Sequence, residues 1–293
     1  MTRTGAAKAS CLAEDHVTVV TGSAGDIGRE LAVRLSGAGH SVCLVDNDDD
    51  RLADTRAACL EVNSRVTSTH LDVTDFDAVD RFARDIRATS GTVHALYNVA
   101  GVIHAGLLTD SRMTDIDRVV AVDLLGTIAV SRALLPHLID SGHGQLVNIS
   151  SAFGLVGVPG YTAYCAAKFG VRGFTEALQQ EVADAAVTVT AVYPGGVRTG
   201  IMRRGTYASS VDAALVQDAF DRRVARTSAA AAAQQTLEGV LAGRRRILIG
   251  ADARVVDALV RVVGMRYQYL SRRMGMRLHR SRGDSGVEQV ASR

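Results

Sequence analysis

Short apolar runs rich in β-branched residues alternate with helical stretches along most of this chain. Seven of these runs are expected to form strands, at residues 17–20, 41–45, 65–71, 93–97, 145–149, 187–193 and 246–249. The stretches between them repeat apolar residues at helical spacing. This alternation predicts an α/β fold: a Rossmann-type doubly wound parallel sheet of about seven strands, with helices on both faces, in a single domain.

Polar or glycine-containing motifs directly follow six of these runs. The carboxyl ends of parallel strands share one edge of a sheet, and open α/β sheets bind their ligands at that edge. The motifs therefore predict one binding site to which six strands contribute. They begin at Thr21, Asp46, Asp72, Asn98, Ser150 and Pro194.

The first motif, residues 21–28, is a glycine-rich turn between a predicted strand and a predicted helix. In such a turn, backbone N–H groups and a helix N-terminus can meet a pyrophosphate. Asp46 ends the second strand, 18 residues beyond Gly28. A carboxylate at that distance is placed to accept hydrogen bonds from a ribose 2′-OH. Together the two features predict a dinucleotide site.

Tyr164 and Lys168 stand four residues apart at the start of a predicted helix, so they share one face of it. An ammonium close to a phenol favours the phenolate and lowers the pKa of the tyrosine. A tyrosine of this kind can exchange a proton with an alcohol or carbonyl oxygen. The same spacing is common on ordinary helices, so its meaning depends on the rest of the chain.

Composition narrows the class of protein. The chain is 47% hydrophobic and 22% charged with a net charge of +2, which suits a globular core and does not indicate nucleic-acid binding. The four cysteines lack the spacing of a disulfide framework or zinc site, so no metal is predicted. We expect neither a secretion signal nor a membrane span, because no apolar run opens the chain and none reaches 18 uncharged residues. A cytoplasmic location is the natural expectation.

Taken jointly, the motifs resemble the short-chain dehydrogenase/reductase family over residues 17–250. Ser151 precedes Tyr164 by 13 residues, the interval usual in that family. The resemblance implies that Tyr164 is the general base in oxidation and the acid in reduction. It also implies that Lys168 lowers the pKa of Tyr164 and holds the nicotinamide ribose, and that Ser151 binds the substrate oxygen.

The resemblance further implies which residues hold the cofactor. Asp72 and Val73 would flank the adenine, residues 98–101 would line the adenosine-ribose side, and Val197 and Thr199 would hold the carboxamide. The residues expected to bind the cofactor are Gly22, Ser23, Asp26, Ile27, Gly28, Asp46, Asp72, Val73, Asn98, Ala100, Gly101, Tyr164, Lys168, Pro194, Gly195, Val197 and Thr199.

Three positions depart from the family pattern. The minor one is Val99, where a second asparagine is common. Asp26 stands where the turn usually has glycine; aspartate tolerates positive φ better than most residues, but its carboxylate would repel a pyrophosphate unless it points away or caps the helix. Asp123 stands where the pattern has a catalytic asparagine that holds a water on a proton relay from the lysine. Aspartate can accept the same hydrogen bonds but brings charge. We therefore count Asp123 as a relay residue, which could also mark a slower enzyme.

Asp46 and the acidic residues after it favour NAD over NADP, since they would repel a 2′-phosphate. The expected function is the NAD-dependent interconversion of a secondary alcohol and its ketone by hydride transfer. Two alternatives stay open. One is an NADPH-dependent reductase of 3-ketoacyl thioesters, which Asp46 opposes. The other is a non-catalytic dinucleotide-binding sensor, to which Asp26 and Asp123 give some support.

In the family, the segment after Thr199 forms a lid over the substrate, and here it is expected at residues 200–227. With the apolar segments after Gly101 and Ser151 it would form a mostly apolar pocket, suited to a lipophilic or cyclic alcohol. The side chains expected in that pocket are His104, Leu107, Leu108, Phe153, Leu155, Val156, Val158, Ile201, Met202, Tyr207, Val211, Leu215, Val216 and Phe220.

The two ends of the chain flank a catalytic domain expected at residues 17–250. Residues 1–16 are expected to form a flexible extension, and residues 251–293 a basic helix and tail. Twelve arginines and four acids give residues 244–293 a net charge of +8, with an apolar stripe between the arginines. We expect this segment either to pack on a second subunit of a homodimer or homotetramer or to form a solvated basic face. Contact with anionic lipid is the less favoured alternative.

Overall fold

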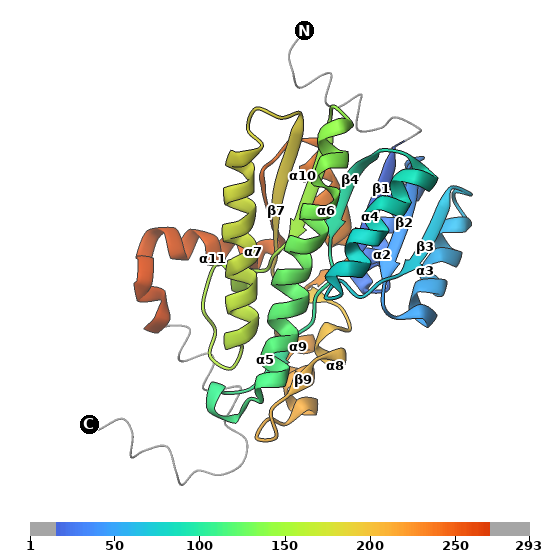
Figure 1. Cartoon of the computed structure of the whole chain (residues 1–293). Coiled ribbons are helices and arrows are strands. Elements are labelled where there is room, and N and C mark those ends of the chain that lie inside the picture. Colours follow the sequence, from blue (N-terminus) through green and yellow to red (C-terminus); the bar gives the residue numbers. More distant parts are fainter. Residues whose placement is uncertain (1–15, 270–293) are drawn as a thin grey trace, which may run out of the picture.

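The computed structural model of the chain describes residues 16–269. The predicted extension, up to residue 15, and the end of the predicted tail, from residue 270, lie outside the described residues. Between them the chain forms one sheet with helices on both sides (Figure 1).

Seven strands form the sheet, in the order β11-β7-β6-β4-β1-β2-β3, and every neighbouring pair is parallel. The predicted doubly wound, single-domain Rossmann-type sheet is therefore confirmed. The strand order reverses between β1 and β4, which is where ligands bind in sheets of this class. The strands are β1 (Val17–Thr21), β2 (Ser41–Asp46), β3 (Val66–His70), β4 (Val93–Asn98), β6 (Gly144–Ile149), β7 (Val187–Pro194) and β11 (Arg246–Ile249).

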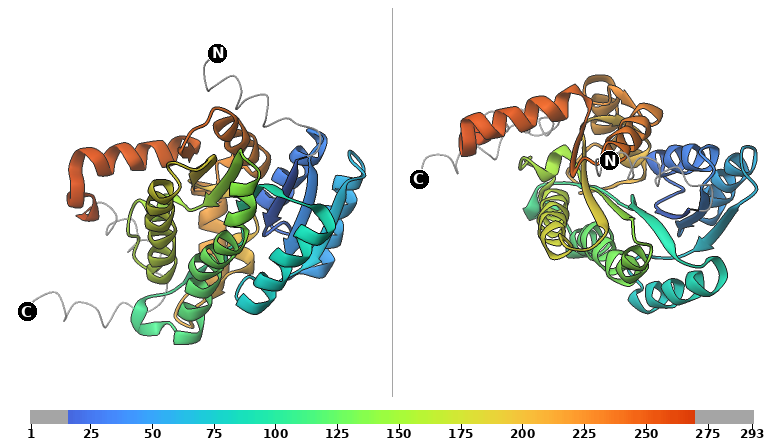
Figure 2. Two further views of the ribbon diagram at one scale, coloured as in Figure 1. Left: turned by 45° about the horizontal axis from the view of Figure 1, so that its top comes forward. Right: turned by 90° about the horizontal axis from the view of Figure 1, so that it is seen from above.

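Helices cover both faces of the sheet, as the view from above shows (Figure 2). One face carries α2 (Asp26–Gly37), α3 (Asp49–Leu60) and α10 (Ala229–Leu241), and the other carries α4 (Phe76–Ser90), α6 (Thr127–Asp140) and α7 (Thr162–Glu181). Neighbouring residues of a strand face opposite sides. Val19 accordingly belongs to the core under α4, α6 and α7, and Val20 to the core under α2, α3 and α10.

The helical run at residues 113–140 consists of three parts. These are α5 (Met113–Val120), a π-helical segment η2 (Ala121–Gly126) and α6. By length and hydropathy this run is one that could cross a membrane. Here it packs on the sheet through the buried Val130, Leu134 and Leu138.

The predicted lid, residues 200–227, consists of short elements and is held to the body by two small parallel ladders. In one, β9 (Thr206–Tyr207) pairs with β5 (His104–Ala105), and in the other, β10 (Thr227–Ser228) pairs with β8 (Val197–Arg198). The lid's helices are α8 (Ile201–Arg204) and α9 (Ala213–Arg223), and two 3₁₀ turns, η1 (Leu108–Asp110) and η3 (Ala152–Gly154), lie in the loops after β5 and β6.

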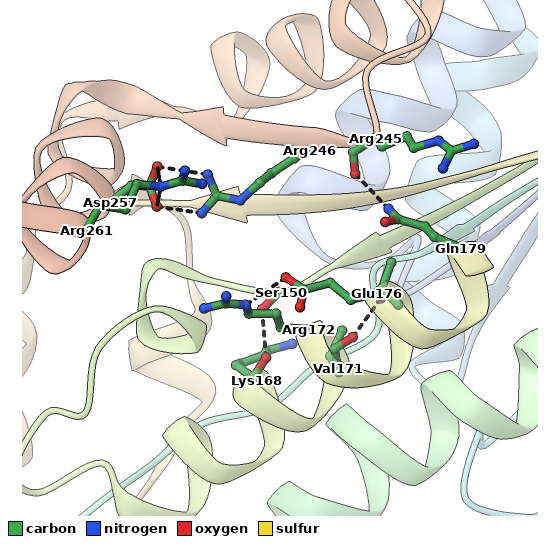
Figure 3. A network of polar contacts seen from close by, with 11 residues as sticks. Ser150, Lys168, Val171, Arg172, Glu176, Gln179, Arg245, Arg246, Asp257 and Arg261 are labelled. Atoms are coloured by element: carbon green, nitrogen blue, oxygen red, sulfur yellow. Dashed lines mark hydrogen bonds and ion pairs between the residues drawn. The ribbon is translucent and has the colours of Figure 1, made fainter. Parts of the chain in front are cut away.

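The last helix, α11 (Gly250–Val263), continues into the turn η4 (Gly264–Arg266) and projects from the body (Figure 2). Its middle is anchored by Arg246, which donates two hydrogen bonds of 2.8 and 2.6 Å to Asp257, while Arg261 donates to the same carboxylate (Figure 3). Beyond that anchor one side of the helix faces solvent, and Val262 is 86% exposed.

Candidate active site

A cavity of about 1050 Å³ opens at the carboxyl ends of the strands. Each of the six motifs that follow the strands contributes to its wall. The wall residues that represent them are Gly22, Asp46, Asp72, Ala100, Ser151 and Gly195. The prediction that these motifs meet at one edge is borne out by this arrangement.

The glycine-rich turn brings bare backbone to the cavity. Gly22 has φ +65°, and a Cβ there would lie 2.5 Å from the Ala100 nitrogen. A Cβ on Gly28 would lie 2.1 Å from the Gly22 oxygen. Neither position tolerates a side chain, so bare backbone borders the cavity here. The amides of residues 23–25 already donate within the fold, and an anion would meet the first amides of α2 instead.

Asp46 is fixed at the end of β2, on the wall of the same cavity. Its carboxylate accepts hydrogen bonds from the backbone nitrogens of Ala24 at 2.9 Å, Asn47 at 2.9 Å and Asp48 at 3.1 Å. A carboxylate has about four acceptor positions, so one is left for a ribose hydroxyl. The negative charge remains next to the turn, where it would oppose a 2′-phosphate.

Asp26 does not need the positive φ that its place in the turn suggested, because it is the first residue of α2. Its carboxylate points toward the lid. It accepts hydrogen bonds of 2.9 Å from the Gly200 nitrogen and from Nη2 of Arg204. Burial alone would raise the pKa of Asp26, but these hydrogen bonds lower it below its usual value. Asp26 thus joins the nucleotide turn to the lid, and its charge is balanced by Arg204.

The catalytic residues expected from the sequence lie together at the bottom of the cavity. Tyr164 and Lys168 lie on α7, and both are buried. The Lys168 ammonium lies 5.6 Å from the centre of the Tyr164 ring, and the Ser151 hydroxyl is close enough to lower the pKa of Tyr164. The Ser150 hydroxyl donates 2.8 Å to the Lys168 carbonyl (Figure 3), which ties the end of β6 to α7.

The pKa of Tyr164 differs in direction from the expectation. Burial raises the pKa of the phenol, while the Lys168 charge and the Ser151 hydroxyl lower it and Asp123 raises it. The net shift is upward. Lys168 therefore lowers the pKa of Tyr164 as predicted, but the rise caused by desolvation of the phenol is larger.

Asp123 lies in the π-helical segment η2, and its side chain is fully buried. One carboxylate oxygen accepts a 2.7 Å hydrogen bond from the Val102 nitrogen, and the other lies 3.0 Å from Nζ of Lys168. Lys168 also donates 3.2 Å to the Ile149 carbonyl. Burial raises the pKa of Asp123, and Lys168 opposes that rise. For Lys168, burial would lower the pKa, but Asp123 and Tyr164 raise it above its usual value.

Three residues expected at the site do not reach the cavity. The Ser23 hydroxyl donates to the Val45 carbonyl inside the fold. Asn98 is buried, and its amide donates to Ser131 at 2.9 Å and Asn148 at 2.8 Å, so it ties β4 to its neighbours. Asp123 is buried behind Lys168, which itself lines the cavity. The other expected residues line the cavity: Gly22, Asp26, Ile27, Gly28, Asp46, Asp72, Val73, Ala100, Gly101, Ser151, Tyr164, Lys168, Pro194, Gly195, Val197 and Thr199.

The substrate half of the cavity is apolar, although only part of the expected set contributes. Leu107 and Leu108 face solvent, with 45% and 60% exposed. His104 is held away from the cavity by hydrogen bonds with Thr206 and Ser111. The expected residues that line the cavity are Phe153, Val156, Val158, Ile201, Met202, Val216 and Phe220, whereas Leu155, Tyr207, Val211 and Leu215 do not.

The C-terminal helix contributes to the site, which the sequence did not reveal. Asp252, Val256 and Leu259 of α11 line the cavity, and so does Tyr267 beyond it. Asp252 accepts a 2.5 Å hydrogen bond from the Gly196 nitrogen, and the Tyr267 hydroxyl accepts one of 3.0 Å from the Gly157 nitrogen. The apolar stripe was visible in the sequence, but its direction depends on how β11 places the helix.

A doubly wound sheet with a glycine-rich turn and a Ser–Tyr–Lys group at one edge defines a nucleotide-binding oxidoreductase. The sequence profile described as short chain dehydrogenase matches residues 16–208. The chain belongs to the short-chain dehydrogenase/reductase family, and it is an enzyme that acts on CH–OH groups.

Particular relatives agree with this assignment. The chain is 44% identical over 259 residues to the Mycobacterium tuberculosis oxidoreductase SadH, covering 88% of this chain and 94% of that protein. It is 34% identical over 188 residues to a Sphingomonas 2-dehydro-3-deoxy-L-rhamnonate dehydrogenase (NAD(+)), covering 63% of this chain and 73% of that one. A Burkholderia phymatum short-chain dehydrogenase solved with NAD has the same fold, with a TM-score of 0.74, 24% identity, and coverage of 92% of this chain and 97% of that one.

Proposed function

We propose that this chain is an NAD-dependent dehydrogenase that interconverts a secondary alcohol, lipophilic or cyclic, and its ketone. The observation that carries the proposal is the position of Ser151 and Tyr164, which lie in the same cavity as the apolar side chains of the lid. A substrate oxygen at these two hydroxyls would have its carbon skeleton among apolar groups.

Tyr164 is the proton donor when a ketone is reduced and the proton acceptor when an alcohol is oxidised. The Ser151 hydroxyl donates to the same substrate oxygen and stabilises the negative charge that develops there. Lys168 stabilises the phenolate form of Tyr164 through its charge. NAD, when bound, supplies the hydride acceptor.

Asp123 acts on this group through Lys168. The oxygen of Asp123 that faces Lys168 is buried and receives no hydrogen bond of good geometry. An acceptor in this position can take the proton-relay role that the family pattern gives to asparagine, and it also keeps the lysine charged.

NAD is the cofactor we propose, because Asp46 holds a negative charge beside the turn where the adenosine ribose would lie. The printed name of the Sphingomonas relative also specifies NAD(+). One observation favours the alternative, an NADPH-dependent reductase of 3-ketoacyl thioesters: Arg51 also lines the cavity and could meet a 2′-phosphate.

The proposal can be tested by following NADH and NADPH absorbance with a panel of cyclic and aliphatic secondary alcohols, their ketones, and a 3-ketoacyl thioester. Turnover with NAD and a lipophilic alcohol or ketone supports it. Preference for NADPH with the thioester would replace it with the alternative. Binding of NADH without turnover of any alcohol or ketone in the panel would contradict it.

We also propose a homodimer or homotetramer in the cytoplasm, with the exposed stripe of α11 packing on a second copy. Val255, Val262 and Met265 are 65%, 86% and 69% exposed on this projecting helix. Light scattering coupled to size-exclusion chromatography should show a defined oligomer. Elution as a monomer that binds anionic vesicles would instead favour the lipid alternative.

A further inference from the structure

Four histidines gather at the amino-terminal edge of the sheet, opposite the catalytic cavity. His16 precedes β1, His40 precedes β2, His94 is the second residue of β4 and His143 precedes β6. These are four of the eight histidines of the chain. They are far apart in the sequence, so no ligand spacing announced them, and the parallel sheet brings them together.

Three of the rings are in direct contact. His16 and His143 place their Nε2 atoms 2.9 Å apart. His16 stacks on His94 with ring centres 4.6 Å apart and planes at 8°. One nitrogen from each of His16, His94 and His143 lies within 4.8 Å of the other two.

His40 completes the group but faces it differently. It meets His16 edge-on at 5.8 Å, and its Nδ1 is hydrogen bonded to the Thr18 hydroxyl at 2.9 Å. We therefore give His40 a packing role behind His16 rather than a ligand role.

We propose that His16, His94 and His143 bind one divalent transition-metal ion of the class that prefers imidazole, with zinc as the representative ion. Zinc takes histidine nitrogens at about 2.0–2.1 Å in tetrahedral geometry. Three protein ligands leave the fourth position to water, which can reach the site because His143 is exposed.

Metals bind the neutral imidazole through a free lone pair. The three rings already bring their nitrogens within 4.8 Å of one another, so one ion could meet all three. The histidine side chains must also be able to move, so that each places a nitrogen at bonding distance from the ion. His143 follows Gly142, which has φ +72°, in the turn before β6, so it is the ligand best able to move.

Metal binding has one visible consequence for the backbone. In the metal-free structure the Val17 N–H donates to Nδ1 of His94 over 3.2 Å. A neutral ring that binds a metal through one nitrogen carries its proton on the other. Neither nitrogen of His94 then accepts from Val17, so the Val17 amide must lose this hydrogen bond when the metal enters.

The test uses the full chain without an affinity tag, treated with chelator and then titrated with Zn²⁺ by calorimetry. The expected result is one tight ion per chain, a rise in Tm with zinc, and a changed amide resonance for Val17. His143→Gln removes an exposed ligand and should weaken binding at least about tenfold, in the range seen when a metal site is damaged. His70→Gln is the matched control, since His70 is exposed and pairs with Asp49 elsewhere.

Zinc binding of equal affinity in His143→Gln, or no zinc-dependent change in Tm and the Val17 amide in the parent chain, would overturn the site. His16→Gln removes the buried ligand and should weaken zinc binding at least as much as His143→Gln. The site lies away from the cavity, so dehydrogenase activity in the chelator-treated protein reports on the proposed function independently.

Discussion

Lys168 Nζ lies 3.0 Å from a carboxylate oxygen of Asp123, and both side chains are buried. A carboxylate here, in place of the neutral amide of the family pattern, puts a negative charge close to Tyr164. That charge raises the pKa of both Tyr164 and Lys168. Asp123 thus keeps Lys168 protonated, and it offsets part of the lowering that Lys168 exerts on the pKa of Tyr164.

Replacing Asp123 by asparagine should shift the pH dependence of alcohol oxidation to lower pH. Oxidation needs the Tyr164 phenolate, so the rate rises as pH rises through the pKa of the phenol. Asp123→Asn removes a charge that raises this pKa, and the rising limb should move down by about one unit, the scale of a nearby like charge. Asp80→Asn, in an exposed pair with Arg132, is the matched control. An unmoved limb, or one moved upward, would contradict this role of Asp123.

Asp46 should set the choice between NAD and NADP. Asp46→Ala removes the carboxylate that the backbone nitrogens of Ala24, Asn47 and Asp48 hold against the cavity. The ratio of kcat/KM for NAD to that for NADP should fall by at least about tenfold, since one close charge interaction of about 1.4 kcal/mol corresponds to that factor. Asp54→Ala alters an exposed acid of α3 that does not line the cavity, and it should leave the ratio unchanged. A preserved ratio in Asp46→Ala would show that the ribose lies elsewhere.

The ion pair between Asp26 and Arg204 should hold the lid on the nucleotide turn. Asp26→Asn and Arg204→Gln each break it, so each should raise the KM for substrate by about the same few-fold factor, as expected for one half-exposed ion pair. The double variant should be no worse than either single one. Arg203→Gln is the control, because Arg203 pairs with Asp221 within the lid. Additive losses in the double variant would mean that the two residues act separately.

The same pair should be insensitive to pH near neutrality. Hydrogen bonds lower the pKa of Asp26 below its usual value, so the carboxylate stays ionised at neutral and mildly acidic pH. Its contribution to stability is present above the unfolded-state pKa and is lost only as pH falls through the lowered folded-state value. The KM difference between parent and Asp26→Asn should therefore stay constant from mildly acidic to neutral pH. A difference that disappears near neutrality would exclude the Asp26–Arg204 ion pair as the contact that holds the lid.

Features set by local pattern were predictable from the sequence. The strand predicted at residues 41–45 is β2, which is one residue longer and ends at Asp46. The six motifs that follow strands line one cavity because the carboxyl ends of parallel strands meet at one edge of the sheet. The Tyr164–Lys168 pair followed from helical spacing alone.

Features set by contacts between distant segments were not predictable. Asp26 meets Arg204 across 178 residues, and no periodicity reports that contact. The π-helical turn that carries Asp123 and the direction of α11 depend on packing against the rest of the fold. Asn98 was assigned to the cofactor because of the family resemblance, yet it ends β4, and Ser131 and Asn148 hold its amide inside the core.

The central claim is that Tyr164 transfers the proton, and Tyr164→Phe tests it most directly. This variant keeps the buried ring and removes only the hydroxyl. We predict that kcat/KM falls by about 10²–10⁴ in both directions, the usual contribution of a general acid–base group. NADH binding measured by fluorescence should weaken by no more than about tenfold, the effect of losing one hydrogen bond to the cofactor. Tyr161→Phe, which alters the neighbouring cavity phenol, should retain most of the turnover. Near-parental turnover by Tyr164→Phe would contradict the account.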